Sequence, residues 1–137
     1  MPGPTQPLPG STDIREKLAA LVAADRLHSC LLFEGPGGVG KAQVARWVAG
    51  LMACEAPRGR QSCGSCWSCR RVEEGSHPDV IHVGLDPERK APIISAEQAR
   101  SILEVVSVQP SWARRRTVIL DPADALHPSA ANALLKT

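Results

Sequence analysis

The residues best suited to chemistry form a glycine-rich loop in the first third of the chain. The loop reads GPGGVGKA and consists of Gly35, Pro36, Gly37, Gly38, Val39, Gly40, Lys41 and Ala42. Glycine tolerates positive φ, so successive backbone N–H groups in such a loop can point at phosphate oxygens. A lysine in the first turn of a following helix can reach the outer phosphates, where the helix dipole favours negative charge. Because an apolar run precedes the loop and a helical pattern follows it, we predict a nucleotide-binding loop.

Two positions depart from what nucleotide hydrolysis requires. The loop ends in Ala42, whose methyl group cannot coordinate magnesium as a Ser or Thr hydroxyl would. Asp121 follows an apolar run and suits a second magnesium contact, but the next residue, Pro122, has no carboxylate to activate water. Asp124 is more typical of a helix cap than of a catalytic base. We therefore predict weak ATP binding, a doubtful magnesium site, no catalytic residue and little or no hydrolysis.

A second candidate site is a group of cysteines with the spacing C-x8-C-x2-C-x2-C, formed by Cys54, Cys63, Cys66 and Cys69. Four thiolates fill a tetrahedral zinc shell and leave no open position, so we predict one structural zinc ion per chain. An iron–sulfur cluster is the alternative, because C-x2-C-x2-C also opens a ferredoxin run, and unliganded thiols are the third. Cys30 lies in an apolar run and is expected to be a small buried side chain.

The cysteine segment, residues 54–69, is polar and contains few apolar residues that could build a core. We interpret it as a module inserted into the main fold and lying outside the sheet. On this interpretation, Cys66→Ser should loosen the insertion and leave the glycine loop and its helix in place.

The bulk composition fits a soluble globular protein. The chain has 137 residues, 43% of them hydrophobic and 22% charged, and a net charge of +2, which gives no global field for nucleic acid. No apolar run is long enough to cross a membrane, and the N-terminus lacks a secretory pattern. Residues 1–12 are rich in Pro and Gly and are predicted to be a disordered tail. Five cysteines without a secretory signal favour metal chemistry over disulfides and a cytoplasmic location.

Helical and strand patterns alternate along the chain. The predicted helices span residues 14–24 and 41–52, then a stretch opened by Ser95 and Gln98 as a capping box, and a final helix that begins near residue 129. The predicted buried strands span residues 30–33, 80–83 and 117–120. This alternation predicts an α/β fold with a mostly parallel sheet flanked by helices, in one domain over residues 13–137.

Several other residues invite a functional interpretation that the sequence does not favour. Arg114, Arg115 and Arg116 could contact phosphates, but a solvated turn before a buried strand explains them as well, and we prefer that explanation. The histidines are not spaced as metal ligands with the cysteines. Trp47 is expected in the core, and Trp67 is the only aromatic residue of the cysteine segment. A nucleic-acid-binding zinc ribbon would need a clearer basic or aromatic face.

Taken together, these motifs resemble one family. The stretch RLHSCLLFEGPGGVGK, the four-cysteine insertion after the loop's helix, HPDV and SAANALLKT are similar to the AAA+ subunits of the bacterial DNA polymerase III clamp loader. The resemblance implies an AAA+ P-loop fold and a role in loading the sliding clamp onto primed DNA. It also implies a hetero-oligomer with tau/gamma and delta subunits, and contact with DNA through that complex.

Two subunit types share these motifs. The ATP-hydrolysing tau/gamma type is expected to carry Lys-Thr in the loop, an Asp-Glu pair after the third strand and an aromatic residue before NALLKT. This chain has Ala42, Pro122 and Ala131 at those places, so it most resembles the delta prime type, with tau/gamma as the alternative. The family continues beyond NALLKT, so we expect a partial AAA+ domain that is poorly stable alone.

Overall fold

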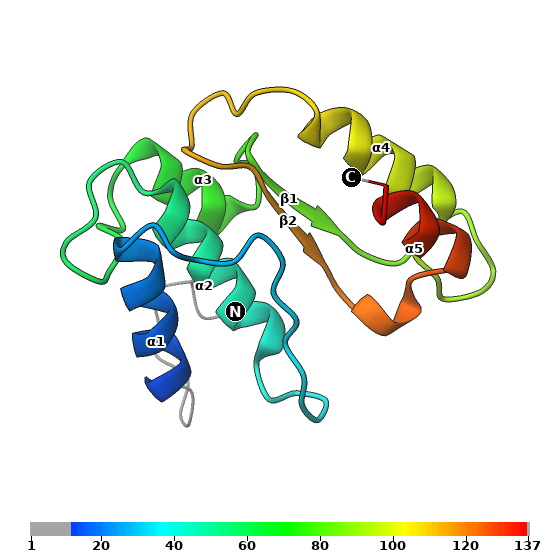
Figure 1. The fold of residues 1–137 in the computed structure, drawn as a ribbon, viewed down its shortest axis with the longest axis horizontal. Helices are drawn as coiled ribbons and strands as arrows, with labels where there is room; N and C mark the ends of the chain where they lie inside the picture. Colours follow the sequence, from blue (N-terminus) through cyan, green and yellow to red (C-terminus); the bar gives the residue numbers. More distant parts are fainter. Residues whose placement is uncertain (1–11, 137) are drawn as a thin grey trace.

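The computed structural model describes residues 12–136, so the predicted tail lies, apart from Thr12, outside the described residues. The elements follow one another as α1 (Thr12–Ala23), α2 (Lys41–Ala53), α3 (Trp67–Glu74), β1 (Val80–Val83), α4 (Ala96–Val106), β2 (Thr117–Leu120), the 3-10 turn η1 (Ala123–Ala125) and α5 (Pro128–Leu134). Figure 1 shows that the two strands lie between a group formed by α1, α2 and α3 and a pair formed by α4 and α5.

The sheet in the described part of the chain has two strands, β1 and β2, which run parallel. Val80 pairs with Thr117 and Val83 pairs with Leu120. A parallel pair needs a long crossover connection, and α4 supplies it. Two of the three predicted strands are therefore confirmed with their predicted bounds, and so is their parallel arrangement.

The predicted strand at residues 30–33 is wrong for this structure. These residues form no regular element and no ladder with β1 or β2. Cys30 is exposed, contrary to the prediction that it is buried, and Leu31 and Leu32 are 40% and 71% exposed. A strand is defined by its partner strand as much as by its own apolar residues, and no strand among residues 12–136 pairs with this one.

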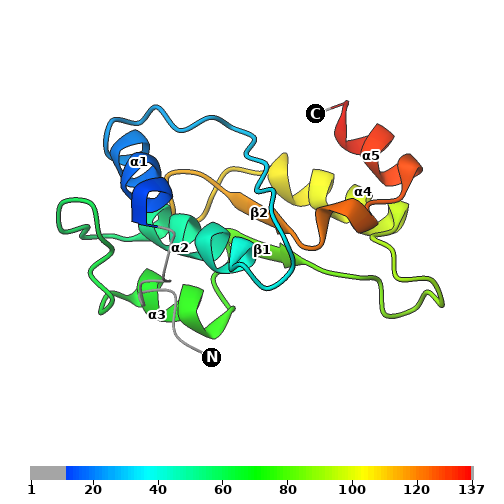
Figure 2. The same cartoon turned by 90° about the horizontal axis from the view of Figure 1, so that it is seen from below.

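Two small apolar cores lie around α2. The first joins α1 to one side of α2 through Leu18, Ala19, Val44, Trp47, Val48 and Leu51. The second joins the other side of α2 to α3 and the sheet through Ala49, Ala53, Val72, Val80 and Ile119. Figure 2 shows α2 between α1 and α3. The prediction that Trp47 is a core residue is confirmed, since it is only 9% exposed.

The helix ends follow the sequence signals in most places. The capping box at α4 is confirmed, because Ser95 accepts a bond from the Gln98 N–H and the Gln98 side chain accepts one from the Ser95 N–H. Helix α1 spans Thr12–Ala23 and not the predicted residues 14–24, and Asp13 lies in its first turn. Helix α2 ends one residue later than predicted, at Ala53. None of the helices between residues 12 and 136 is long and apolar enough to cross a membrane.

A buried ion pair fixes the loop that leads from α4 into β2. Asp79 is fully buried, directly before β1, and its carboxylate lies 2.8 Å from the guanidinium of Arg116, whose side chain is 9% exposed. The same carboxylate accepts backbone N–H bonds from Ser111, Trp112 and Ala113 at 2.7–3.0 Å. Arg116 also donates to the carbonyls of residues 105, 108 and 109. Arg116 is therefore a structural residue and not part of a solvated turn.

Replacing Asp79 by Asn is expected to lower the free energy of unfolding by about 3 kcal/mol, because it leaves the buried guanidinium of Arg116 without a counter-charge. The matched control is Asp124→Asn, at an exposed position, where a change within about 0.5 kcal/mol is expected. Urea unfolding of the full-length protein measures both. Equal midpoints for the two variants would show that the ion pair does not stabilise the fold.

The same group gives a pH prediction. Burial acts to raise the pKa of Asp79, but the N–H donors of Ala113, Ser111 and Trp112, together with Arg116, outweigh it and hold the pKa well below its usual range. A lowered pKa contributes stability above the unfolded value of about 3.9, and this is lost as the pH falls toward the folded value. The stability difference between wild type and Asp79→Asn should therefore shrink below about pH 4. A difference that stays constant from neutral pH to pH 2.5 or so would contradict this account.

Candidate nucleotide loop and candidate metal centre

Three of the four glycines in the glycine loop have positive φ. Gly35, Gly38 and Gly40 adopt positive φ angles of 151°, 76° and 95°, whereas Gly37 does not. A side chain at Gly38 or Gly40 would be strained for this reason alone. Gly40 is the N-cap residue of α2 and offers no side-chain cap, so the first N–H groups of the helix are left for another acceptor. The loop therefore ends at a helix N-terminus suited to an anion.

Lys41 is the first residue of α2 and its side chain lies over the loop. Its Nζ donates hydrogen bonds to the carbonyl oxygens of Gly35 and Pro36, each at 2.8 Å. The ammonium group is thus held where the loop turns. A bound phosphate would compete with these two carbonyls for the same three donors.

The second predicted element of the nucleotide site, Asp121, lies directly after β2. Its backbone N–H donates to the carbonyl of Val83 at 3.0 Å, which extends the parallel ladder by one bond, and its side chain is exposed. Figure 1 shows that α2 begins on the side of the molecule where both strands end. Among residues 12–136, no hydrogen bond or ion pair joins Lys41 to Asp121.

Two residues near the strand ends, His82 and Arg46, could not be placed at the site from the sequence. The pKa of His82 in β1 is lowered by burial and by the positive charge of Arg46 on α2, while Asp121 acts in the opposite direction. The Nε of Arg46 is buried and has no hydrogen-bond partner in the described part of the chain. Arg46 follows Lys41 by five residues, and only the packing of α2 on the sheet brings it to this region.

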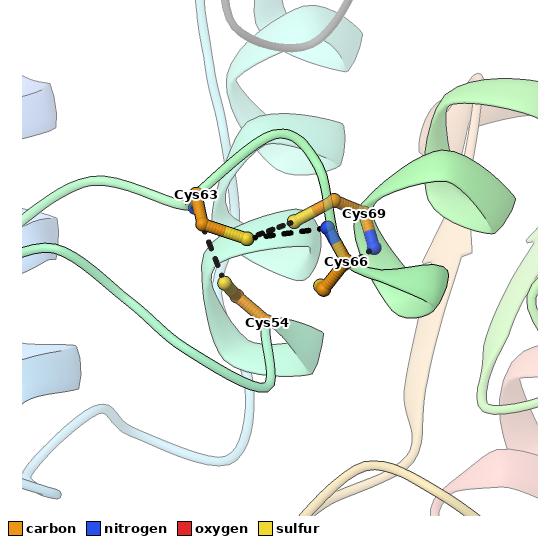
Figure 3. A group of neighbouring side chains, drawn as sticks. All are labelled: Cys54, Cys63, Cys66 and Cys69. Atoms are coloured by element: carbon orange, nitrogen blue, oxygen red, sulfur yellow. Dashed lines mark hydrogen bonds between the residues drawn. The ribbon is translucent and has the colours of Figure 1, made fainter.

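The four predicted metal ligands converge. The sulfur atoms of Cys54, Cys63, Cys66 and Cys69 all lie within 4.8 Å of one another. The Sγ atoms of Cys63 and Cys69 are 3.9 Å apart, close to the separation of about 3.8 Å that tetrahedral zinc–sulfur bonds would give. Figure 3 shows these side chains turned toward one point between the end of α2 and the start of α3. The group could bind a metal ion.

Helix ends and N–H···S bonds position the sulfurs. Cys54 is the C-cap residue of α2, and Cys66 is the N-cap residue of α3, where its sulfur accepts the N–H of Cys69. The N–H of Cys63 donates to Cys54 Sγ at 3.2 Å, and the N–H of Cys66 donates to Cys63 Sγ at 3.3 Å. Gly64 turns the chain at φ 71°. Such N–H donors stabilise thiolates, which are the form that binds metal.

The electrostatics of the thiols differ with their surroundings. Backbone N–H donors from Ser65 and Cys66 lower the pKa of Cys63 to about 6. Burial raises the pKa of Cys54 and of Cys69. The thiolate of Cys63 is thus favoured by the backbone alone, whereas Cys54 and Cys69 would need the charge of a metal ion to stay deprotonated.

Glu55 supports the cysteine group from outside it and was also missed. Its Oε1 accepts the N–H of Ser68 at 3.1 Å and the Ser68 hydroxyl at 2.9 Å. Ser68 is completely buried and lies between the last two cysteines. The contact ties the residue after Cys54 to the first turn of α3. The sequence signal was a carboxylate next to one ligand and a hydroxyl between two others.

Helix α3 begins inside the cysteine segment, residues 54–69, and connects it to the main fold. Cys69 is buried, and Val72, one turn further along α3, packs with Ala49, Val80 and Ile119 in the second core. The loop at residues 55–65 is polar as predicted. The helix that follows it belongs to the core.

Comparison with known proteins places this geometry in a family. The sequence model of the family described as "DNA polymerase III, delta subunit" matches residues 10–137. DNA polymerase III subunit delta' of Pseudomonas aeruginosa is 36% identical over 114 residues, which cover 83% of this chain and 34% of that protein. Subunit delta' of Escherichia coli is 32% identical over 122 residues, 89% of this chain and 36% of that protein.

A second subunit type is also similar. DNA polymerase III subunit tau of Escherichia coli is 32% identical over 128 residues, which cover 93% of this chain and 19% of that protein. The chain spans about a third of the length of the delta' relatives that it matches. With a family match over nearly all of its residues, the chain belongs to the DNA polymerase III delta-subunit family.

Proposed function

We propose that this chain is part of a delta prime-type subunit of the bacterial DNA polymerase III clamp loader. In this role it acts in the cytoplasm within a hetero-oligomer with tau/gamma and delta subunits, and helps to load the sliding clamp onto primed DNA. The observation that carries the proposal is the family match over residues 10–137. The small parallel sheet and the glycine loop at the start of α2 support an AAA+ domain built around them.

The nucleotide site is proposed to be degenerate. The loop glycines and Lys41 keep the geometry for weak phosphate binding, with Gly35 to Ala42 and Asp121 as the contacting residues. Ala42 and Pro122 lack the magnesium ligand and the base that hydrolysis requires. The subunit would then contribute to the loader through assembly and not through its own ATP turnover.

The cysteine group is proposed to hold one structural zinc ion. Four sulfurs within 4.8 Å of one another suit a single ion at their centre. An iron–sulfur cluster would place several irons and bridging sulfides between the same thiolates and would need them further apart. The zinc would hold the end of α2 to the start of α3 and supply no reaction chemistry.

Reconstituted clamp loading tests the proposal. A loader assembled from tau/gamma, delta and the full-length protein should load the clamp onto primed single-stranded DNA, and omission of the protein should abolish loading. Lys41→Ala in this subunit should leave loading unchanged, because a delta prime-type subunit does not hydrolyse ATP. If Lys41→Ala abolishes loading, the alternative assignment as an ATP-hydrolysing tau/gamma-type subunit is correct.

A further inference from the structure

The structure joins two tryptophans that are far apart in the sequence into one exposed surface. Trp112, in the loop after α4, is 65% exposed, although large aromatic side chains are usually covered. Its ring lies against that of Trp67 on α3, with the ring centroids 4.8 Å apart. The guanidinium of Arg71 lies 5.6 Å from the centroid of the Trp67 ring. In Figure 1 the loop after α4 passes beside α3 on its way to β2.

The backbone that carries Trp112 is fixed before any partner binds. The buried carboxylate of Asp79 accepts the N–H groups of Ser111, Trp112 and Ala113, and Arg116 holds that carboxylate in place. Binding therefore does not have to order the backbone of this loop, and a rigid aromatic ring loses little conformational entropy when a partner binds. An exposed ring on a flexible loop would be weaker evidence for a binding site, because binding would have to order the loop.

Two arginines whose side chains are unpaired in the described part of the chain lie close in sequence to the two tryptophans, Arg70 to Trp67 and Arg114 to Trp112. Arg70 and Arg114 are exposed, and neither side chain has an ion-pair or hydrogen-bond partner among residues 12–136. The loop segment SVQPSWARRR, residues 107–116, contains three arginines and no acidic residue. Of the three, Arg115 pairs with Asp25 and Arg116 pairs with Asp79, which leaves Arg114. On α3, Oε2 of Glu74 lies 3.6 Å from Nη1 of Arg71 and partly neutralises that guanidinium. The neighbouring Glu73 is exposed. The two free arginines are therefore available to phosphate groups.

We infer that Trp67, Arg70, Arg71, Trp112 and Arg114 form a binding surface for single-stranded nucleic acid. A base would stack on the exposed ring of Trp112, and the arginines would contact the flanking phosphates. A base-paired duplex offers no free base face to this ring, so single strands are preferred. The inference deepens the proposed function, because it names a contact of this subunit with DNA apart from the nucleotide loop.

The test uses the full-length protein and a fluorescently labelled (dT)20 oligonucleotide, followed by anisotropy. Trp112→Ala is expected to weaken binding about 5- to 100-fold, the loss that follows when one stacked base is released. Trp112→Phe keeps an aromatic face and should retain most of the affinity. Arg114→Gln should weaken binding and reduce the slope of log affinity against log salt by about 0.7. Arg100→Gln, at an exposed position of α4, is the matched control and should bind like wild type.

Loader assembly is measured in parallel by gel filtration with the tau/gamma and delta subunits. Reduced (dT)20 binding with intact assembly supports the inference. Unchanged (dT)20 binding in Trp112→Ala overturns it and leaves the proposed function standing. Loss of assembly in Trp112→Ala with unchanged (dT)20 binding would show that the surface contacts a protein, which also overturns the inference. Far-UV circular dichroism checks that the Ala variant keeps its secondary structure, as expected for a side chain that is 65% exposed.

Discussion

One zinc ion per chain is expected to copurify with the full-length protein, and removal of one ligand should unfold more than the cysteine loop. The four sulfurs lie within 4.8 Å of one another around a point that a single ion can fill. Four thiolates leave no position for water or substrate, so the ion would stabilise the fold and take no part in a reaction. Metal analysis of the purified protein measures the stoichiometry. Stoichiometric iron with visible absorbance would contradict it.

The decisive experiment makes the same substitution, Cys to Ser, at one cysteine inside the group and at one outside it. Cys69→Ser removes a buried ligand that lies one turn before Val72, a residue of the second core. It should abolish zinc binding and lower the free energy of unfolding by about 3 kcal/mol or more, as loss of a structural metal does. Cys30→Ser changes an exposed thiol outside the group and should do neither.

The extent of the damage separates two views of the cysteine segment. If the segment were a separate module, Cys66→Ser or Cys69→Ser would loosen only residues 54–69. Because α3 packs on α2 and β1 through Val72, we expect hydrogen-exchange protection to fall in α2 and β1 as well. If hydrogen-exchange protection in α2 and β1 stays at the wild-type level and falls only in the cysteine loop, the segment is an independent insertion.

Local signals in the sequence were sufficient for several elements. β1 and β2 were predicted with their observed bounds, because short apolar runs closed by loop residues are typical of buried parallel strands. The capping box at Ser95 and Gln98 depends on residues three apart, so the sequence alone reveals it. The cysteine group was also predictable, since short spacings and one longer loop bring the ligands together whatever the rest of the fold does.

Features that depend on distant contacts were not predictable in the same way. Residues 30–33 have the pattern of a buried strand, but no described strand pairs with them and Leu32 is 71% exposed. Asp79 and Arg116 are 37 residues apart, and only the pairing of β1 with β2 brings them together. The contact of Trp67 with Trp112 depends on that same loop. The sequence therefore favours a solvated turn for Arg114, Arg115 and Arg116, although Arg116 is the buried partner of Asp79.

The full-length protein is expected to show no ATP turnover of its own. Gly38 and Gly40 have positive φ and Lys41 lies over the loop. We propose that these residues still bind phosphate, so nucleotide binding and hydrolysis should be affected unequally. Ala42 lacks the hydroxyl that would hold magnesium, and Pro122 lacks the carboxylate that would activate water. Both losses act on the transition state for phosphoryl transfer, where each such group is worth about 100-fold or more. Steady-state turnover should therefore fall at least about 100-fold below that of a tau/gamma subunit assayed beside it.

Lys41→Ala serves as the control for contaminating activity, because a true signal from this site must disappear with the lysine. Turnover that is comparable to that of the tau/gamma subunit and is abolished by Lys41→Ala would contradict the proposal of a degenerate site. It would support the alternative, an ATP-hydrolysing subunit. If both proteins are silent, the double substitution Ala42→Thr with Pro122→Glu asks whether these two positions alone limit the reaction. We expect little rescue, because phosphoryl-transfer sites of this class can also require an arginine supplied in trans, and such an arginine contributes about 10³- to 10⁵-fold. If the double variant hydrolyses ATP only when tau/gamma is present, the remaining defect lies at the interface between the two subunits. If the isolated double variant shows strong turnover, Ala42 and Pro122 alone account for the loss of hydrolysis.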